Sequence, residues 1–229
     1  MKIPGPLCEA VLEERENRFV ARIRQGAERA RAHVPNSGRL RELLFPGARV
    51  LVRKAEAEGR VTQYDLVMVE LPHTLVCIDT RLPPGLLEEA ILAGRLCEFA
   101  AYGQSHREVA FGRSRLDLRL EGEEVPCFIE TKLVTLVEEG RALFPDAPTS
   151  RGRRHMEELV LARKEGYRAA AVFIVQREDA RDFAPHGILD PEFATTLRWA
   201  VAQGVEAHAY ACQVTREEVV LQRRLPLVL

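Results

Sequence analysis

The fold of the second half of the chain is decided by two short segments, RLDLRL at residues 115–120 and CFIETK at residues 127–132. Their alternating apolar and polar residues predict two β-strands joined by a short acidic link. Side chains alternate between the two faces of a strand, so Glu130 and Lys132 share one face, and Asp117 meets them if the strands pair. Charged groups inside such a pattern are costly unless they serve a function. These three residues are therefore the first candidates for chemistry.

The three side chains suit metal-assisted hydrolysis of a phosphodiester. Two neighbouring carboxylates offer the oxygen ligands that Mg²⁺ or Mn²⁺ prefers, so we expect Asp117 and Glu130 to bind the metal. Lys132 completes the predicted catalytic set by orienting the nucleophile or stabilising charge on the phosphoryl group. We name Glu89 as a further candidate ligand, with Glu108 as its competitor. The spacing alone also fits carboxylates on a solvated strand face.

Composition indicates an ordinary globular protein but leaves the partner open. The chain has 229 residues, 46% hydrophobic and 29% charged, which allows one large domain or two small ones. The net charge of −1 hides an asymmetry, because residues 1–54 carry 12 basic and 6 acidic side chains, whereas residues 83–229 carry 19 and 23. A basic arm on an acidic body fits a polyanion-binding module beside a metal site. A solvated charged surface is the alternative.

Several function classes lack their sequence signatures. Five cysteines without a CxxC pair indicate a reducing compartment, and neither a signal peptide nor a membrane-length apolar run is present. We therefore expect a cytoplasmic protein without membrane contact. The six histidines show no zinc-ligand spacing, and the chain has no GxGxxG, Walker A or nucleophile-elbow motif. Zinc, dinucleotide, ATP and serine-hydrolase chemistry are not expected.

The first third of the chain predicts a small β-barrel. Phe19, Ala21 and Ile23 share one strand face and are expected in its core. Short strands with a helical piece over residues 40–44 favour a five-stranded Greek-key barrel of the OB type, placed over residues 1–82 and expected to bind nucleic acid. The strands are predicted over residues 7–13, 18–24, 30–34, 48–54, 64–71 and 74–80. The DNA-contacting residues predicted here are Arg22, Arg24, Arg39 and Arg41.

Residues 83–229 predict an α/β (α+β) domain with a mixed sheet and helices on its faces. Helices are expected over residues 86–100, 151–164 and 191–203, and residues 138–148 are expected to form a loop. Met156, Leu159 and Val160 are expected to form the buried stripe of the second helix, and Asp190 is the predicted N-cap of the third. Further strands are predicted over residues 169–175, 205–211 and 219–225. Trp199, at helical spacing, is expected in the core. The helix over 151–164 carries a polar cluster that we expect to contact DNA, consisting of Arg151, Arg154 and His155.

The chain contains a series of longer motifs: HVPNSGRL at 33–40, PG at 46–47, CIDT at 77–80, EAI at 89–91, SRLD at 114–117, FIETK at 128–132, VTL at 134–136, FPDAPT at 144–149, RG at 151–152 with His155, and FAP at 183–185. Taken together, these motifs show that the chain resembles the sugar fermentation stimulation protein family from near residue 7 to its C-terminus. Two positions depart from the usual pattern: Ser37 stands where the family tends to have Thr, and Thr131 where it commonly has Val.

This resemblance implies an N-terminal OB-like barrel and a C-terminal domain similar to PD-(D/E)xK nucleases. It also implies a bacterial protein that binds DNA with weak sequence preference, and it carries Asp117, Glu130 and Lys132 over as metal and catalytic residues. We therefore expect a Mg²⁺-dependent nuclease-like site. The alternative is a non-catalytic DNA-binding regulator of sugar (maltose) metabolism genes that retains a relic nuclease fold. RNA is left open as a partner, and both a monomer and a homodimer fit the sequence.

Overall fold

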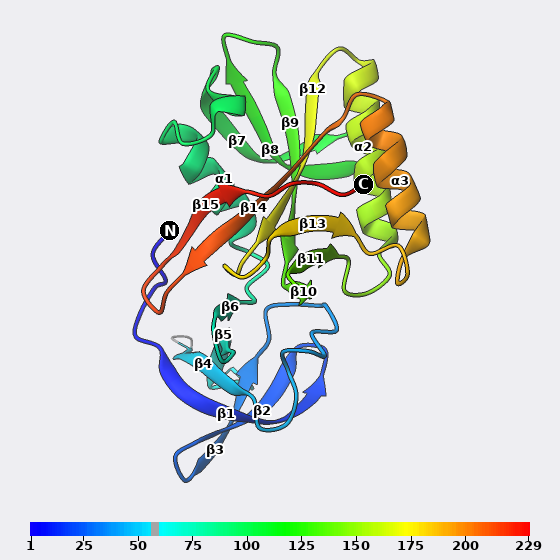
Figure 1. Ribbon diagram of the computed structural model, residues 1–229. Helices are drawn as coiled ribbons and strands as arrows, with labels where there is room; N and C mark the ends of the chain where they lie inside the picture. The colour runs from blue at the N-terminus through cyan, green and yellow to red at the C-terminus, as the bar shows by residue number, and fades with distance from the viewer. Residues whose placement is uncertain (56–59) are drawn as a thin grey trace.

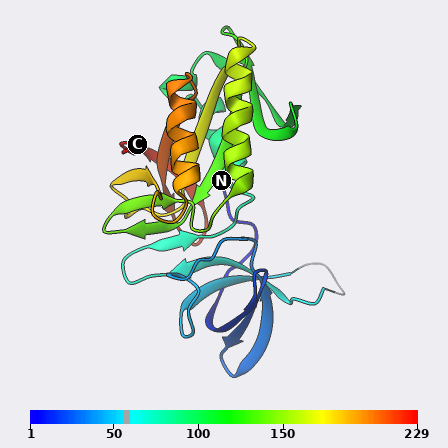
Figure 2. The same cartoon turned by 90° about the vertical axis from the view of Figure 1, so that its right-hand side faces the viewer.

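The computed structural model describes residues 1–55 and 60–229, and it shows a small barrel joined to a larger mixed-sheet unit (Figure 1). The barrel, in blue and cyan, lies below the larger unit. A small three-stranded sheet lies between them in both views (Figures 1 and 2). The predicted α+β class with an N-terminal OB-like barrel is confirmed.

The barrel has the strand order β3-β2-β1-β4-β5-β6 and closes through a parallel pairing of β3 with β5. Its interior is filled by aliphatic side chains that are fully buried, among them Leu12, Ile23, Leu40 and Leu66. Alternation of these residues with charged ones places one face of each strand inside. The strands are β1 (Cys8–Asn17), β2 (Val20–Gln25), β3 (Glu28–His33), β4 (Arg49–Lys54), β5 (Tyr64–Glu70) and β6 (Leu75–Cys77).

Two local predictions for the barrel are wrong. Strand β1 continues to Asn17, so the turn before β2 consists of Arg18 and Phe19, and the Phe19 side chain is 48% exposed instead of buried. Residues 41–44 form a turn instead of a helix. Leu40 adopts a left-handed backbone (φ 49°), its carbonyl accepts the amides of both residues 43 and 44, and Pro46 follows too soon for a second helical turn.

The larger unit is built on a six-stranded mixed sheet of order β15-β14-β12-β9-β8-β7. At its centre β12 pairs in parallel with both β9 and β14, and its residues from Ala169 to Val175 are all buried. That burial explains the continuous apolar run, because helices cover both faces of the strand. The strands are β7 (Tyr102–Phe111), β8 (Ser114–Gly122), β9 (Cys127–Val134), β12 (Arg168–Val175), β14 (Glu206–Val214) and β15 (Val219–Arg224).

Helix α1 (Pro83–Leu92) covers one face of this sheet, and α2 (Ser150–Lys164) and α3 (Pro191–Ala202) cover the other (Figures 1 and 2). The predicted N-cap Asp190 is confirmed, since its carboxylate accepts the amide of Phe193 at 2.9 Å. The helix predicted to reach residue 100 ends at Leu92, near Gly94, and a 3₁₀ turn (Cys97–Phe99) follows. No helix within the described ranges is long and apolar enough to cross a membrane.

The prediction that Trp199 lies in the core is wrong, because the residue is 42% exposed.

Four strands of the larger unit were not predicted from the sequence. Strand β7 is an edge strand whose residues are mostly exposed, so it carries little apolar alternation. The loop expected over residues 138–148 contains β11 (Arg141–Phe144), which pairs with β10 (Leu136–Glu138) and β13 (Asp182–Pro185). These three strands form the small sheet next to the barrel.

The barrel and the larger unit share a hydrophobic core. Barrel residues including Leu51, Met68 and Cys77 belong to the same buried cluster as Leu86 of α1 and Ile129 of β9. Two further connections fix the units together. The Gln176 side chain donates to the Cys77 carbonyl at 2.8 Å, while the Gln176 carbonyl accepts the Cys77 amide at 3.0 Å. The N-terminal segment also crosses to the larger unit, where the amide of Ile3 donates to the Glu217 carbonyl.

Candidate active site

The candidate site forms where the hydrogen-bonded ladder between β8 and β9 stops. The last backbone pair is Leu118 with Ile129. One residue further on, the side chain of Asp117 takes the place of a backbone acceptor. Its Oδ2 accepts hydrogen bonds from the Thr131 amide, at 2.8 Å, and from the Thr131 hydroxyl. The strands thus separate at the point where a carboxylate has been inserted between them.

Glu130 is almost fully buried, with only 2% of its surface exposed. Its Oε1 contacts both the Lys132 Nζ, from the same face of β9, and Nδ1 of His155, from α2. Its Oε2 is buried and has no hydrogen-bond partner among the described residues. A buried carboxylate oxygen without a partner is unfavourable unless a cation or water reaches it.

The two carboxylates differ in their electrostatic environment. Burial raises the pKa of Asp117, and the neighbouring Glu130 charge raises it further, against the opposing hydrogen bonds from Thr131. Burial also acts to raise the pKa of Glu130, but Lys132 and His155 outweigh it and the pKa is lowered. Glu130 is therefore held ionised while Asp117 bears the unfavourable charge.

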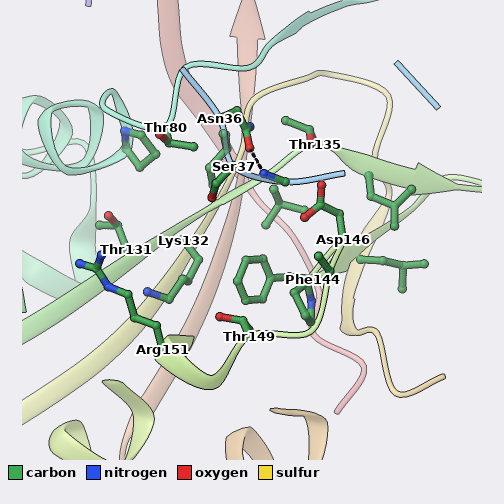
Figure 3. A pocket seen from close by; sticks show the side chains of 18 of the residues that line it. Asn36, Ser37, Thr80, Thr131, Lys132, Thr135, Phe144, Asp146, Thr149 and Arg151 are labelled. Carbon is green, nitrogen blue, oxygen red and sulfur yellow. Dashed lines mark hydrogen bonds between the residues drawn. The ribbon is translucent and has the colours of Figure 1, made fainter. Parts of the chain in front are cut away.

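All three predicted catalytic residues line one cavity of about 460 Å³ between the barrel and the larger unit. Asn36, Ser37 and Gly38 contribute from the barrel. Figure 3 shows the Ser37 hydroxyl directed toward the side of the cavity from which Lys132, Thr149 and Arg151 project. The barrel thus forms one wall of the site.

The barrel wall is held by hydrogen bonds from two sides. The Arg15 guanidinium donates to the carbonyls of Arg18, Asn36, Gly38 and Arg39, which joins the β1–β2 turn to the loop over residues 36–39. From the larger unit, Asp146 Oδ2 accepts the Leu40 amide at 3.2 Å. A Cβ on Gly38 would lie 2.2 Å from that same Asp146 oxygen, so the loop and the carboxylate approach too closely for a side chain.

Neither of the further carboxylates lines this cavity. Glu89 is exposed, and its carboxylate pairs with the Met1 amino group and with Arg95, both at 3.2 Å. Glu108 adopts a left-handed backbone (φ 54°) on the edge strand β7 and is exposed. It falls opposite Asp117 in the register of β7 and β8, between two regular pairs. Neither residue therefore belongs to the lining of the candidate site.

The predicted DNA-contacting arginines fall into two groups. Arg22 and Arg24 are half-exposed but pair with Glu13, Glu14 and Glu16 on β1, which offsets their charge. In contrast, the second group is exposed and has no carboxylate partner within residues 1–55 and 60–229; it comprises Arg39, Arg41, Arg151 and Arg154. Arg18, which the sequence did not single out, joins the second group and lines the cavity with Arg151.

The prediction that His155 contacts DNA does not fit its position. The side chain is 2% exposed and lies between Glu130 and Arg151, whose Nε donates to its Nε2 at 3.4 Å. His155 is therefore a positioning residue for Glu130. The helical spacing of Arg151 and His155 was visible in the sequence, but the same spacing does not reveal which of them faces the sheet.

The donor set fits a hard divalent cation. Within the described residues no three His, Cys, Asp or Glu side chains converge to hold a metal, so the candidate site rests on two carboxylates. Mg²⁺ is usually held in this way, by one or two carboxylates with waters and substrate phosphates. Asp117 and the unpartnered Oε2 of Glu130 would supply the protein ligands.

Comparison with known proteins now identifies the family. The chain matches the sugar fermentation stimulation protein RE domain over residues 81–218 and the SfsA N-terminal OB domain over residues 14–78. The chain belongs to the sugar fermentation stimulation protein family. The sugar fermentation stimulation protein homologs of Desulforamulus reducens and Moorella thermoacetica are both 46% identical to it, covering 97% and 93% of this chain and 93% of their own lengths.

A solved structure of this family has the same fold throughout. The Pyrococcus furiosus SfsA structure superimposes with a TM-score of 0.91 at 33% identity, covering 100% of this chain and 98% of that one. That protein was solved in complex with Ca²⁺. The sugar fermentation stimulation family fold, with its OB and RE domains, thus extends over the whole chain.

Proposed function

We propose that this family member is a divalent-metal-dependent nuclease acting on DNA. The observation that carries the proposal is the pair of carboxylates, Asp117 and Glu130, which line one interdomain cavity with Lys132, while Glu130 Oε2 lacks a partner. The Ca²⁺ complex of the Pyrococcus furiosus relative supports a divalent cation in this family. We assign residues 1–82 to nucleic-acid binding and residues 83–229 to catalysis.

The side chains divide the work of hydrolysis. Bound Mg²⁺ or Mn²⁺ would supply Lewis-acid polarisation of the phosphodiester and a nucleophilic water at neutral pH. Asp117 and Glu130 provide the anionic ligands, and His155 fixes the Glu130 rotamer. Lys132 places its ammonium at Glu130, where it can stabilise negative charge that develops on the phosphoryl group. Arg151 and Arg18 at the cavity supply unpaired positive charge for the neighbouring phosphates.

The test is cleavage by the purified full chain of plasmid and single-stranded DNA, with Mg²⁺, Mn²⁺ or EDTA. We expect metal-dependent products from the wild type and a loss of at least about 100-fold in Asp117→Ala and Lys132→Met. Asp182→Asn is the matched control, because Asp182 is a carboxylate paired with Arg141 outside the cavity. Equal cleavage by wild type and Asp117→Ala would reject the proposal.

A second candidate is DNA binding without cleavage. The observation that favours it is the Lys132–Glu130 ion pair, which neutralises one carboxylate in the absence of a metal. Binding would then depend on the unpaired arginines and would weaken as the salt concentration rises, because the release of counterions from the DNA becomes less favourable. Under this alternative, neither the wild type nor any variant cleaves DNA. Glu130→Gln then leaves both the affinity for DNA and its salt dependence unchanged.

A further inference from the structure

A hydroxyl group of the barrel is available in the cavity that holds the candidate metal ligands. Ser37 lines this cavity together with Asp117, Glu130 and Lys132, although it comes from a barrel loop and they come from β8 and β9. Its hydroxyl points toward the side of the cavity from which Lys132 and Arg151 project (Figure 3). The barrel therefore directs a hydrogen-bond donor toward two cationic side chains of the larger unit.

Three other hydroxyls of the lining already have partners in the protein. Those of Thr80 and Thr131 donate to a backbone carbonyl and to the Asp117 carboxylate, respectively. That of Thr149 accepts an amide of the first turn of α2. The Ser37 side chain, in contrast, is exposed and forms no hydrogen bond with any residue in the described ranges, so its hydroxyl is free to donate to a ligand.

The loop that carries Ser37 is held on both sides of this residue. The Asn36 side chain donates to the Ile78 carbonyl at 2.9 Å and accepts the Gly38 amide at 2.8 Å. The Arg15 guanidinium donates to the Gly38 carbonyl at 2.8 Å. Because both neighbours of Ser37 are held, its hydroxyl is positioned before a ligand arrives, and little conformational entropy is lost on binding.

The charges around the hydroxyl indicate which ligand it would meet. Arg18, Lys132 and Arg151 line the same cavity, and the two arginines have no carboxylate partner in the part of the chain that the structure describes. Cations together with a hydroxyl donor suit the non-bridging oxygens of a phosphate. The two carboxylates of the site repel the same phosphate as long as no metal ion neutralises them. A phosphate should therefore reach Ser37 only when a divalent cation is bound.

We propose that Ser37 is a substrate-binding residue, whose hydroxyl donates a hydrogen bond to a non-bridging oxygen of the phosphodiester at the metal site. This inference rests on the proposed function for the nature of the substrate, and it adds a residue of the barrel to the active site. The barrel then binds the reacting phosphate itself, in addition to the phosphates on either side of it.

Fluorescence anisotropy tests the proposal with a labelled DNA of about 20 nucleotides, as a single strand and as a duplex, and the form that binds more tightly is used. Every protein carries Lys132→Met, so that cleavage cannot interfere, and each is measured with Mn²⁺ and with EDTA. We expect Ser37→Ala to weaken binding about tenfold with Mn²⁺, as for one hydrogen bond to a charged group, and less than twofold in EDTA. Ser37→Thr keeps the hydroxyl and should retain the affinity under both conditions.

Arg39→Ala is the matched control, because Arg39 is an exposed residue of the same loop whose side chain does not line the cavity. Any loss of affinity that it causes should be equal with Mn²⁺ and in EDTA. Isothermal titration should also show the same Mn²⁺ affinity with and without Ser37→Ala when no DNA is present.

Four results would each overturn the proposal. They are an undiminished affinity of Ser37→Ala for DNA with Mn²⁺, an equal loss in EDTA, a loss in Ser37→Thr as large as in Ser37→Ala, and a weaker affinity of Ser37→Ala for Mn²⁺ itself. Failure of the nuclease function is distinguishable from these results. A metal-linked loss in Ser37→Ala without any cleavage by the wild type would reject the nuclease function alone, whereas cleavage by the wild type without that loss would reject only the role of Ser37.

Discussion

The imidazole Nδ1 of His155 contacts Oε1 of Glu130, so a residue of α2 fixes the central carboxylate of β9. Both side chains are almost fully buried. The contact, shared with Lys132, occupies one carboxylate oxygen and leaves the other for a ligand. Metal affinity should therefore depend on a residue that itself is no metal ligand.

Replacing His155 should weaken metal binding without removing a ligand. We expect His155→Ala to lower the affinity for Mn²⁺ by about 10- to 100-fold, because Glu130 loses the partner that orients it. His155→Asn, which can place an amide near the position of Nδ1, should recover part of the loss. Isothermal titration with Mn²⁺ measures both. Arg154→Ala, an exposed neighbour on the same helix, is the control, and an unchanged affinity in His155→Ala would contradict the prediction.

Neutralising Asp117 should stabilise the metal-free protein while abolishing its response to metal. Burial and the Glu130 charge raise the pKa of Asp117, so its ionised form opposes folding. Asp117→Asn removes that charge and keeps an oxygen for Thr131. We expect the free energy of unfolding in EDTA to rise by about 1 kcal/mol. Thermal unfolding with and without Ca²⁺ should show a metal-dependent increase in Tm for the wild type only. A less stable Asp117→Asn protein in EDTA would be evidence against this balance.

The contact between Asp146 and the barrel loop should contribute to stability. Asp146→Ala removes the acceptor of the Leu40 amide and should lower the free energy of unfolding by about 1–2 kcal/mol, as for a hydrogen bond to a charged group. Asp182→Ala, which breaks an ion pair at the surface, should cost less than about 1 kcal/mol. Urea denaturation measures both. Equal losses would show that the interdomain contact carries no special weight.

The pairing of Glu206 with Arg168 should make stability depend on acid pH. Burial opposes ionisation of Glu206, but His208 and Arg168 outweigh it and lower its pKa to about 2. A lowered pKa stabilises the folded state above the unfolded-state pKa, and this contribution is lost as the pH falls from about 4.5 toward 2. Glu206→Gln should therefore be about 1–2 kcal/mol less stable at pH 7, after allowance for partial exposure.

Denaturation at several pH values measures this difference. The difference in the free energy of unfolding between the wild type and Glu206→Gln should disappear as the pH falls below 4. A difference that stays constant down to pH 2 would mean that the variant loses packing and not the ion pair. Arg168 also lies over the rings of Phe99 and Tyr102, so its own replacement is the less specific test.

The sequence predicted most of what depends on local periodicity. Three predicted features are confirmed because each pattern is compatible with one local structure. They are the buried strand before Gln176, the N-cap at Asp190 and the buried stripe on α2. The meeting of Glu130 and Lys132 followed from strand alternation, and Asp117 joined them through the hairpin. These features depend only on residues that are close together in the sequence.

Features that depend on distant neighbours were missed. Strand β13 pairs with β11 about 40 residues away, and nothing in FAP at residues 183–185 signals that partner. Phe19 looked like a core residue because it follows the alternation of β2, yet β1 runs on and turns it outward. His155 looked like a surface residue because α2 carries many charges, and only the position of Glu130 decides that it faces inward.

The shared core has a consequence for how this protein can evolve. Leu51, Met68 and Cys77 of the barrel are buried against Leu86 and Ile129 of the larger unit, and Ile3 belongs to the same cluster. Either half, separated from the other, would expose an apolar surface that its partner now covers. The two halves therefore cannot be recombined into new proteins as independent modules. A substitution in the shared core of one half must be compatible with the residues that pack against it from the other half.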